Sequence, residues 1–215
     1  MRLRRSLSLA VALGALAGCG SQTVHELPPA AEPPRSRAAA RIPAGTVTAI
    51  GNAPEGVVGD AATAAALDRG RRVAVVSARE RRLDLYDTRT RRLIGHAPAG
   101  LGPTHVACLD RGPCYVADTR GDALLVFAVG AGVEPTRRYG LPGGPYGLAL
   151  DRARRRLYVT LPGRNELVAL VAHGRPHVVA RWPTVRQPDS VTVDEGTGDV
   201  FVTGRADGVL ERVTP

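Results

Sequence analysis

Short runs of alternating apolar and polar residues recur along most of the chain. Four of these runs end in aspartate, and they read A-A-A-L-D to Asp68, H-V-A-C-L-D to Asp110, Y-G-L-A-L-D to Asp151 and D-S-V-T-V-D to Asp194. The four aspartates lie 42, 41 and 43 residues apart. Short runs with β-branched and aromatic residues between polar turns predict antiparallel strands.

Each of these runs belongs to a longer repeated unit. A second run follows the aspartate, ending at Ser77, Asp118, Thr160 and Thr203, and a third follows around Leu83, Val126, Val168 and Leu210. Three units open on Gly102-Pro103, Gly144-Pro145 and Gln187-Pro188. A period near 42 with about four short strands is typical of a β-propeller blade. A β-sandwich with coincidental spacing does not explain why opener, aspartate and second run recur together.

Two stretches carry a family resemblance. The segment from Gly102 to Phe127 resembles an NHL repeat, and R-R-R-L-Y-V-T-L-P-G-R-N-E-L-V-A-L resembles a YVTN repeat. The similar segments span roughly residues 57 to 215 and imply an all-β, propeller-like fold. Those families generally have six or seven blades, whereas this chain has four recognisable units, so closure of the ring is an open question.

Three arrangements can deal with the open ends. The last unit stops after three strands, and Thr46–Ile50 reads as a lone strand that could complete it and latch a four-bladed ring, the arrangement we favour. Otherwise two chains could pair into a larger ring as a homodimer, or the chain could be a truncated copy. The first unit is the least regular, because Gly59–Ala66 is rich enough in alanine to be helical.

The N-terminus has the layout of a secretory signal. Arg2, Arg4 and Arg5 precede an apolar run that ends in L-A-G-C at Cys19. This string resembles the lipobox of bacterial lipoproteins, which implies cleavage before Cys19 and lipidation of its thiol. We therefore expect a signal peptide over residues 1–18, a lipidated tether rich in Pro, Ala and Arg over 19–44, and the repeat domain over 45–215. The protein would be anchored to the cell membrane on its extracytoplasmic face.

The net charge of +9 comes entirely from arginine, since the chain has no lysine. Such a surface suits anionic partners, although the explanation we favour is a coding bias toward arginine. Aromatic residues are only 4% and are not interleaved with basic runs, so nucleic-acid binding is not predicted.

Two cysteines flank one predicted turn. Cys108 and Cys114 should lie on adjacent strands, where a disulfide or two buried small hydrophobes are both reasonable. The recurring aspartates Asp68, Asp110, Asp151 and Asp194 precede turns, and we expect their carboxylates to accept backbone hydrogen bonds there.

A ligand rim is predicted where the loop before the inner strand meets the loop between the second and third strands. The first set of loops holds Thr104, His105, Tyr146, Asp189 and Ser190, and the second holds Arg79, Arg120, Arg164 and Arg205. Four arginines around an opening would attract and hydrogen-bond an anionic group on a glycan, lipid or peptide. The alternative is a merely solvated rim.

Catalytic signals are weak. Some propellers similar to gluconolactonases hold a metal with Glu, Asn and Asp ligands, and here Asn165 and Glu166 are adjacent and Asn52 precedes the first unit. The five histidines show no metal-ligand spacing, and we predict no metal or cofactor. The sequence therefore predicts a lipid-anchored binding or scaffold module of the cell envelope, bound to an anionic ligand or a protein partner. The alternative is a metal-dependent hydrolase or lactonase.

Overall fold

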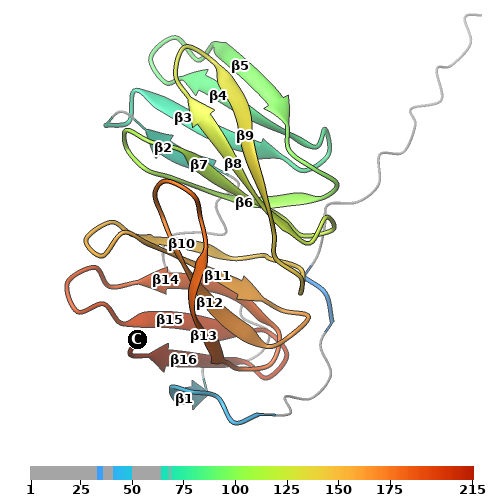
Figure 1. Cartoon of the computed structure of the whole chain (residues 1–215), viewed down its shortest axis with the longest axis vertical. Helices are drawn as coiled ribbons and strands as arrows, with labels where there is room; N and C mark the ends of the chain where they lie inside the picture. The colour runs from blue at the N-terminus through green and yellow to red at the C-terminus, as the bar shows by residue number, and fades with distance from the viewer. Residues whose placement is uncertain (1–32, 36–40, 50–63, 68) are drawn as a thin grey trace, which may run out of the picture.

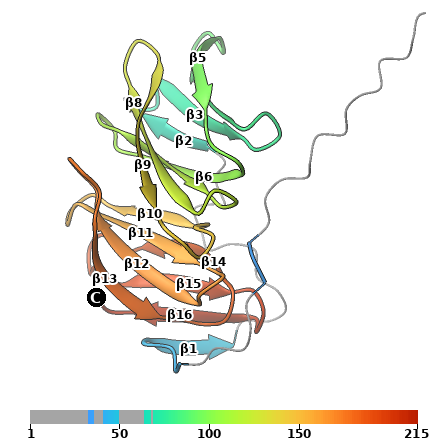
Figure 2. The same ribbon diagram turned by 45° about the vertical axis from the view of Figure 1, so that its right-hand side comes forward.

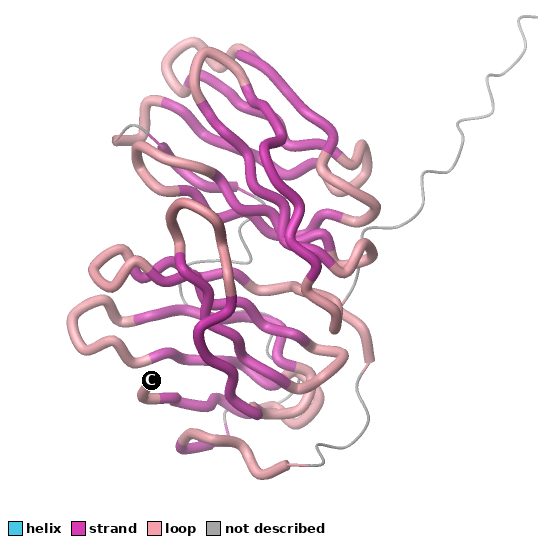
Figure 3. The backbone as a smooth tube through the Cα atoms, in the orientation of Figure 1, coloured by secondary structure: helices cyan, strands magenta, loops and turns pink. Residues whose placement is uncertain are grey.

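The computed structural model describes residues 33–35, 41–49, 64–67 and 69–215, which form an all-β structure (Figure 1). The described part contains only strands and connecting loops (Figure 3), and it includes no helix that could cross a membrane. The all-β prediction is confirmed. The predicted signal peptide, Cys19, Asn52 and Asp68 lie outside the described residues.

The strands form four antiparallel sheets of four strands each. The first sheet contains β2 (Ala64–Leu67), β3 (Arg72–Ser77), β4 (Arg82–Asp87) and β5 (Leu93–Pro98). The second contains β6 (Pro103–Cys108), β7 (Cys114–Asp118), β8 (Ala123–Val129) and β9 (Val133–Gly140). The third contains β10 (Leu148–Asp151), β11 (Arg156–Leu161), β12 (Glu166–Val171) and β13 (Val178–Pro183). The fourth contains β14 (Pro188–Val193), β15 (Val200–Gly204), β16 (Val209–Val213) and β1 (Thr46–Ala49).

The core consists of three layers, one between each pair of consecutive sheets. Successive side chains of a strand point to opposite faces, so the alternating runs supply both layers of the inner sheets. The layer between the first and second sheets includes Leu83, Leu85 and Phe127, all fully buried. The next layers contain Tyr115 and Tyr158, which are 1% and 2% exposed. Burying apolar side chains of this size stabilises a protein by roughly 1.5–3 kcal/mol each.

The N-terminal strand completes the fourth sheet, as predicted. Strand β1 pairs antiparallel with β16, and Thr46 lies opposite Arg212. The helix considered for Gly59–Ala66 is wrong for its described residues, because Ala64 to Ala66 belong to β2. Pairing with β3, in which Ala65 lies opposite Ala74, satisfies this backbone and outweighs the helical preference of alanine.

The four sheets form an arc rather than a closed ring. Strands β6, β10 and β14 pack in turn beside β2, β6 and β10 along the inner edge of the arc. Among the described strands no comparable packing joins the first sheet to the fourth, and these two sheets lie at opposite ends of the molecule (Figures 1 and 2). The favoured prediction of a closed four-bladed ring is therefore wrong for this part of the chain.

Candidate functional site

The predicted rim lies at one edge of the sheets. In the last three sheets, backbone hydrogen bonds join the loop before the inner strand to the end of the second strand or the loop that follows it: Thr119 N to Gly102 O at 2.9 Å, Tyr146 N to Thr160 O at 3.0 Å and Arg205 N to Gln187 O at 3.1 Å. In the first sheet, the pairing of Ser77 with Arg82 places Arg79 on the corresponding loop. Arg79, Arg120, Arg164 and Arg205 therefore occupy equivalent loops.

These arginines remain accessible. Arg79, Arg120 and Arg164 are exposed and Arg205 is half-buried. The stems of two of them lie over opener glycines, since a Cβ at Gly102 would be 2.7 Å from Arg120 Cγ and one at Gly143 would be 3.0 Å from Arg164 Cδ. Glycine at these openers thus makes room for the arginine side chains along the rim.

Polar side chains fill the space beneath the rim. The rings of His105 and Tyr146 meet edge to face with centroids 4.6 Å apart, which joins the second sheet to the third. The hydroxyls of Thr104 and Thr119 lie 2.8 Å apart, and Thr119 donates to Pro145 O at 2.7 Å. Because Thr104 and Thr119 are buried and their hydroxyls are hydrogen-bonded, they hold the inner ends of these two sheets in a defined relation.

Asp189 lies below the rim rather than on it. Its side chain is buried, and Thr203 Oγ1 donates to its Oδ1 at 2.7 Å. Burial raises the pKa of this carboxyl, while the hydrogen bond from Thr203 and the charge of Arg205 act in the opposite direction. Ser190 beside it is also buried. Asp189 is thus suited to organising the fourth sheet near Arg205.

Three residues that position the rim were not predicted for that role. Asp118 Oδ1 accepts from Leu101 N at 2.9 Å and Gly102 N at 2.8 Å. Asp122 Oδ1 accepts from the backbone of residues 143 and 144, and Asn165 Oδ1 accepts from Gln187 N at 2.8 Å. Asp122 and Asn165 both have positive φ, 49° and 52°, one repeat apart. Their recurrence in the second-to-third strand turn is the sequence signal that could have revealed them, because Asn and Asp favour such turns.

The residues considered as metal ligands have structural partners. Asn165 holds the opener of the fourth sheet, and Glu166 forms an ion pair with Arg181 at 3.0 Å. Within the described residues, no group of three or more His, Cys, Asp and Glu side chains is arranged to hold a metal ion.

Part of the predicted tether packs against the rim. Pro33 is buried, and Pro34 lies so close to Gly144 that a Cβ there would be 2.6 Å from Pro34 Cγ. Gly163 is next to the same proline, at 3.5 Å on the same measure. Residues 33–35, within the segment predicted to be a tether, therefore lie beside the loops on either side of the first two strands of the third sheet.

The cysteines and the turn aspartates have structural places. The sulfur atoms of Cys108 and Cys114 are 1.97 Å apart, a disulfide between β6 and β7. Asp151 and Asp194 accept backbone hydrogen bonds inside their own turns, from Arg154 N and Gly196 N. Asp110 differs, because its carboxylate accepts from Arg69 N of the preceding sheet at 2.8 Å and so joins two sheets.

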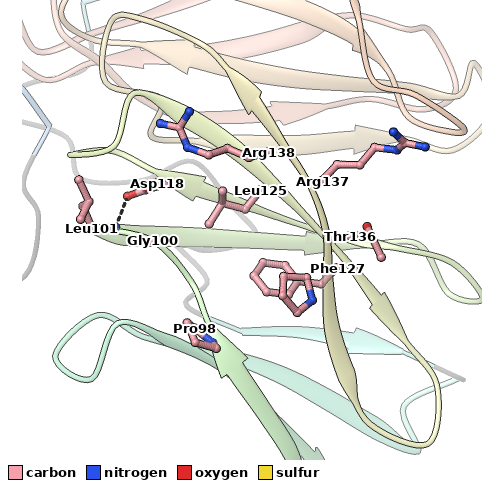
Figure 4. Close-up of a pocket in the computed structure, with 10 residues that line it drawn as sticks. Pro98, Gly100, Leu101, Asp118, Leu125, Phe127, Thr136, Arg137 and Arg138 are labelled. Atoms are coloured by element: carbon pink, nitrogen blue, oxygen red, sulfur yellow. Dashed lines mark hydrogen bonds between the residues drawn. The ribbon is translucent and has the colours of Figure 1, made fainter.

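A separate pocket of about 440 Å³ opens on the outer side of the second sheet (Figure 4). Pro98, Leu125 and Phe127 line its apolar part, and Arg137 and Arg138 of β9 border it. The guanidinium of Arg138 donates to Gly121 O. Sequence reasoning did not predict this pocket because its lining comes from two different repeats.

Comparison with known proteins shows the fold. The sequence matches no family model and no curated protein. The structure is similar to the β-propeller domain of Cps50 (Swd1) from Myceliophteria thermophila, with a TM-score of 0.61 and 12% identity over 71% of this chain and 50% of that one. It is also similar to a functionally unknown protein from Desulfotomaculum acetoxidans, with a TM-score of 0.61 and 13% identity over 66% of this chain and 48% of the other.

A third similar structure is the catalytically inactive H270A virginiamycin B lyase from Staphylococcus aureus with quinupristin, with a TM-score of 0.57, 12% identity and coverage of 79% of this chain and 56% of that one. The propeller-like prediction is confirmed by these likenesses. The chain spans about half the length of these solved structures. At such low identity the likeness concerns the fold alone, and proteins with this fold perform different tasks.

Proposed function

We propose that this protein is a lipid-anchored, extracytoplasmic binding module of the cell envelope whose rim recognises an anionic envelope polymer. The observation that carries the proposal is the recurrence of accessible arginines on equivalent loops, above all Arg120 and Arg164 of neighbouring sheets. Guanidinium groups bind carboxylate and phosphate through paired, charge-assisted hydrogen bonds. Two of them on adjacent loops can hold successive anionic groups of a polymer.

The supporting framework beneath the rim favours binding by a pre-formed surface. Asp118, Asp122 and Asn165 fix the opener loops through backbone hydrogen bonds. The contact between His105 and Tyr146 fixes neighbouring sheets relative to each other. A surface held in this way loses little conformational entropy on binding, so weak individual contacts can add up to useful affinity.

The membrane anchor is tested by replacing the cysteine of the L-A-G-C string. Cys19→Ser should move the protein from the membrane to the soluble fraction and abolish incorporation of labelled palmitate, because a multiply acylated cysteine anchors firmly. Cys108→Ser is the control, since it replaces a cysteine outside the L-A-G-C string, at the cost of the disulfide with Cys114, and should leave the protein in the membrane fraction. Unchanged membrane attachment and no label in the wild type would refute the anchor.

The rim is tested by sedimentation with purified peptidoglycan that retains its anionic wall polymers. The double variant Arg120→Ala/Arg164→Ala should bind about tenfold more weakly, since two exposed ionic contacts of about 0.7 kcal/mol each correspond to one decade. The control Arg89→Ala/Arg92→Ala removes the same charge from exposed positions in the β4–β5 turn, at the opposite sheet edge.

Equal weakening in both double variants would indicate attraction by net charge alone and contradict a rim site. Vesicles of phosphatidylglycerol mixed with phosphatidylcholine identify the source of the anionic group. Binding to these vesicles, with no binding to the wall polymer, would replace the polymer by a lipid surface as the ligand.

A further inference from the structure

The fourth sheet ends in a face built like an interface that lacks its other half. Tyr115, Tyr158 and Phe201 occupy the same position of successive repeats, 43 residues apart on the second strand of their sheets. The two tyrosines pack into the layer shared with the following sheet and are 1% and 2% exposed. Phe201 is only half-buried, and by alternation Leu210 and Arg212 share its face. We call these three residues the trailing face.

The first sheet presents the opposite half. Cys114 and Val116 of the second sheet point toward the preceding sheet and are fully buried. The residues at the equivalent positions of the first sheet are Val73 and Val75, and both are only half-buried. Tyr86 lies opposite Val73 on β4 and is half-buried too, whereas Asp84, opposite Val75 on the same face, is 3% exposed and paired with Arg82. We call Val73, Val75 and Tyr86 the leading face.

The curvature of the arc indicates how much of a ring is missing. In the three similar structures, 66–79% of this chain aligns with 48–56% of the other chain. The four sheets therefore follow roughly half of a propeller ring. The first and fourth sheets lie at the two ends of the molecule, where the remaining half would attach (Figures 1 and 2). Propellers range from about four to eight blades, so a ring of eight lies within the known sizes.

We propose that a second copy of this chain supplies the missing half, packing head to tail so that two arcs close one ring of eight sheets. The trailing face of each copy meets the leading face of the other, which creates two identical interfaces related by a twofold axis. Each interface repeats the packing found inside the chain, with Phe201 entering the partner as Tyr115 and Tyr158 enter the following sheets. The ring has no unpaired terminal face, which is why assembly stops at two copies.

The first test is the mass of the full-length wild-type chain in a mild non-ionic detergent, determined by sedimentation equilibrium. A protein mass of twice that of one chain is expected at micromolar concentration, with no higher species. A monomer at all accessible concentrations would overturn the proposal. A continuing series of larger species would overturn it as well, because it would mean that the arcs add end to end without closing.

The second test addresses the faces. Phe201→Arg on the trailing face and Val73→Asp on the leading face should each raise the dissociation constant of the dimer about a hundredfold or more, since each damages both interfaces. A mixture of the two variants should regain the dimer, because a mixed pair keeps one intact interface and places Arg opposite Asp in the other. The control Val179→Arg alters an exposed valine of β13, 42% exposed and outside both faces, and should dimerise like the wild type.

The proposal is overturned if both face variants dimerise like the wild type, or if Val179→Arg dissociates as they do. It is also overturned if the mixture stays monomeric although each variant keeps its β-sheet circular dichroism. Should Phe201→Arg unfold, Leu210→Glu tests the same face at a half-buried position. These readouts are independent of the anionic-polymer assay, so failure of one does not imply failure of the other.

Discussion

The carboxylate of Glu211 joins β16 to the segment before β1 and to the link between β13 and β14, and its removal should be the most destabilising single change where β1 pairs with β16. Glu211 is fully buried on β16. Its Oε2 accepts from Val185 N at 2.9 Å and from the hydroxyl of Thr184, in the link between the third and fourth sheets. Its Oε1 accepts from Gly45 N at 2.8 Å, just before β1. One side chain therefore fixes β1 and the entry to β14 at once.

The expected loss of unfolding free energy in Glu211→Ala follows from the hydrogen-bond donors that would be left without an acceptor. A buried donor that loses its partner costs about 1–3 kcal/mol. In Glu211→Ala, the buried groups of Thr184 and Val185 contribute about 1.5 kcal/mol each, whereas the partly buried N–H of Gly45 can reach water. We expect a loss of about 3 kcal/mol in the free energy of unfolding.

The variant Glu211→Gln distinguishes the contribution of Oε2, which accepts from Thr184 and Val185, from that of Oε1, which accepts from Gly45. Its single acceptor oxygen can serve Thr184 and Val185, but its amide group then faces the N–H of Gly45, donor against donor. We expect a loss of about 1–2 kcal/mol, localised at β1. Glu134→Ala, at an exposed position of β9, is the control and should stay within about 0.5 kcal/mol of the wild type.

Urea unfolding followed by tryptophan fluorescence measures these differences. Trp182 is the only tryptophan and packs beside the layer between the third and fourth sheets. With a slope of about 2 kcal/mol per molar urea, Glu211→Ala should lower the midpoint by about 1.5 M. The reasoning is refuted if Glu211→Ala costs less than about 1 kcal/mol, or if Glu211→Gln costs as much as Glu211→Ala.

Three further predictions concern other buried groups. Replacing both Cys108 and Cys114 by alanine should lower the free energy of unfolding by about 2 kcal/mol, the value for so short a closed loop, and thiol titration of the denatured wild type should detect neither of these cysteines. Burial raises the pKa of Asp189 above its unfolded value, so the protein loses stability as pH rises through the folded pKa. Asp189→Asn should therefore raise the Tm at pH 7 but not at pH 3. An equal effect on the Tm at both pH values would contradict this cause. Burial raises the pKa of Tyr115 to about 12, so the free energy of unfolding should fall as pH rises above 10. Tyr115→Phe should remove the last step of the tyrosine titration followed by absorbance at 295 nm. Persistence of that step would assign it to another tyrosine.

Local pattern was sufficient for most elements of this fold, but not for β2, whose alanines suggested a helix. The runs ending at Asp110, Asp151 and Asp194 lie at or next to the ends of inner strands, because alternation and turn residues act over a few neighbours in the chain. The strand at Thr46 was also predicted, since a repeat that ends after three strands leaves one strand edge to be paired.

The sequence was sufficient to predict which loops hold the rim residues, but not which of these residues are exposed. Arg120 and Arg164 lie on equivalent loops because their repeats have equal length. The depth of each residue depends on packing between sheets, and this is why Asp189 lies beneath the rim while the arginines are accessible. The roles of Asp122 and Asn165 depend on contacts with the opener of the next repeat, about 20 residues away, which no local pattern reveals.

The sequence by itself therefore determined the all-β class, the four repeats and the residues of the rim loops, because the alternation within each run and the recurrence of the runs can both be seen along the chain. Only the tertiary structure decided that four sheets make an arc, that Pro34 lies on the rim and that Glu211 binds the segment before β1. Large side chains such as Tyr115 and Tyr158 fill the layers between the sheets. That packing is a property of residues one repeat apart, and it takes effect only when the repeats stack.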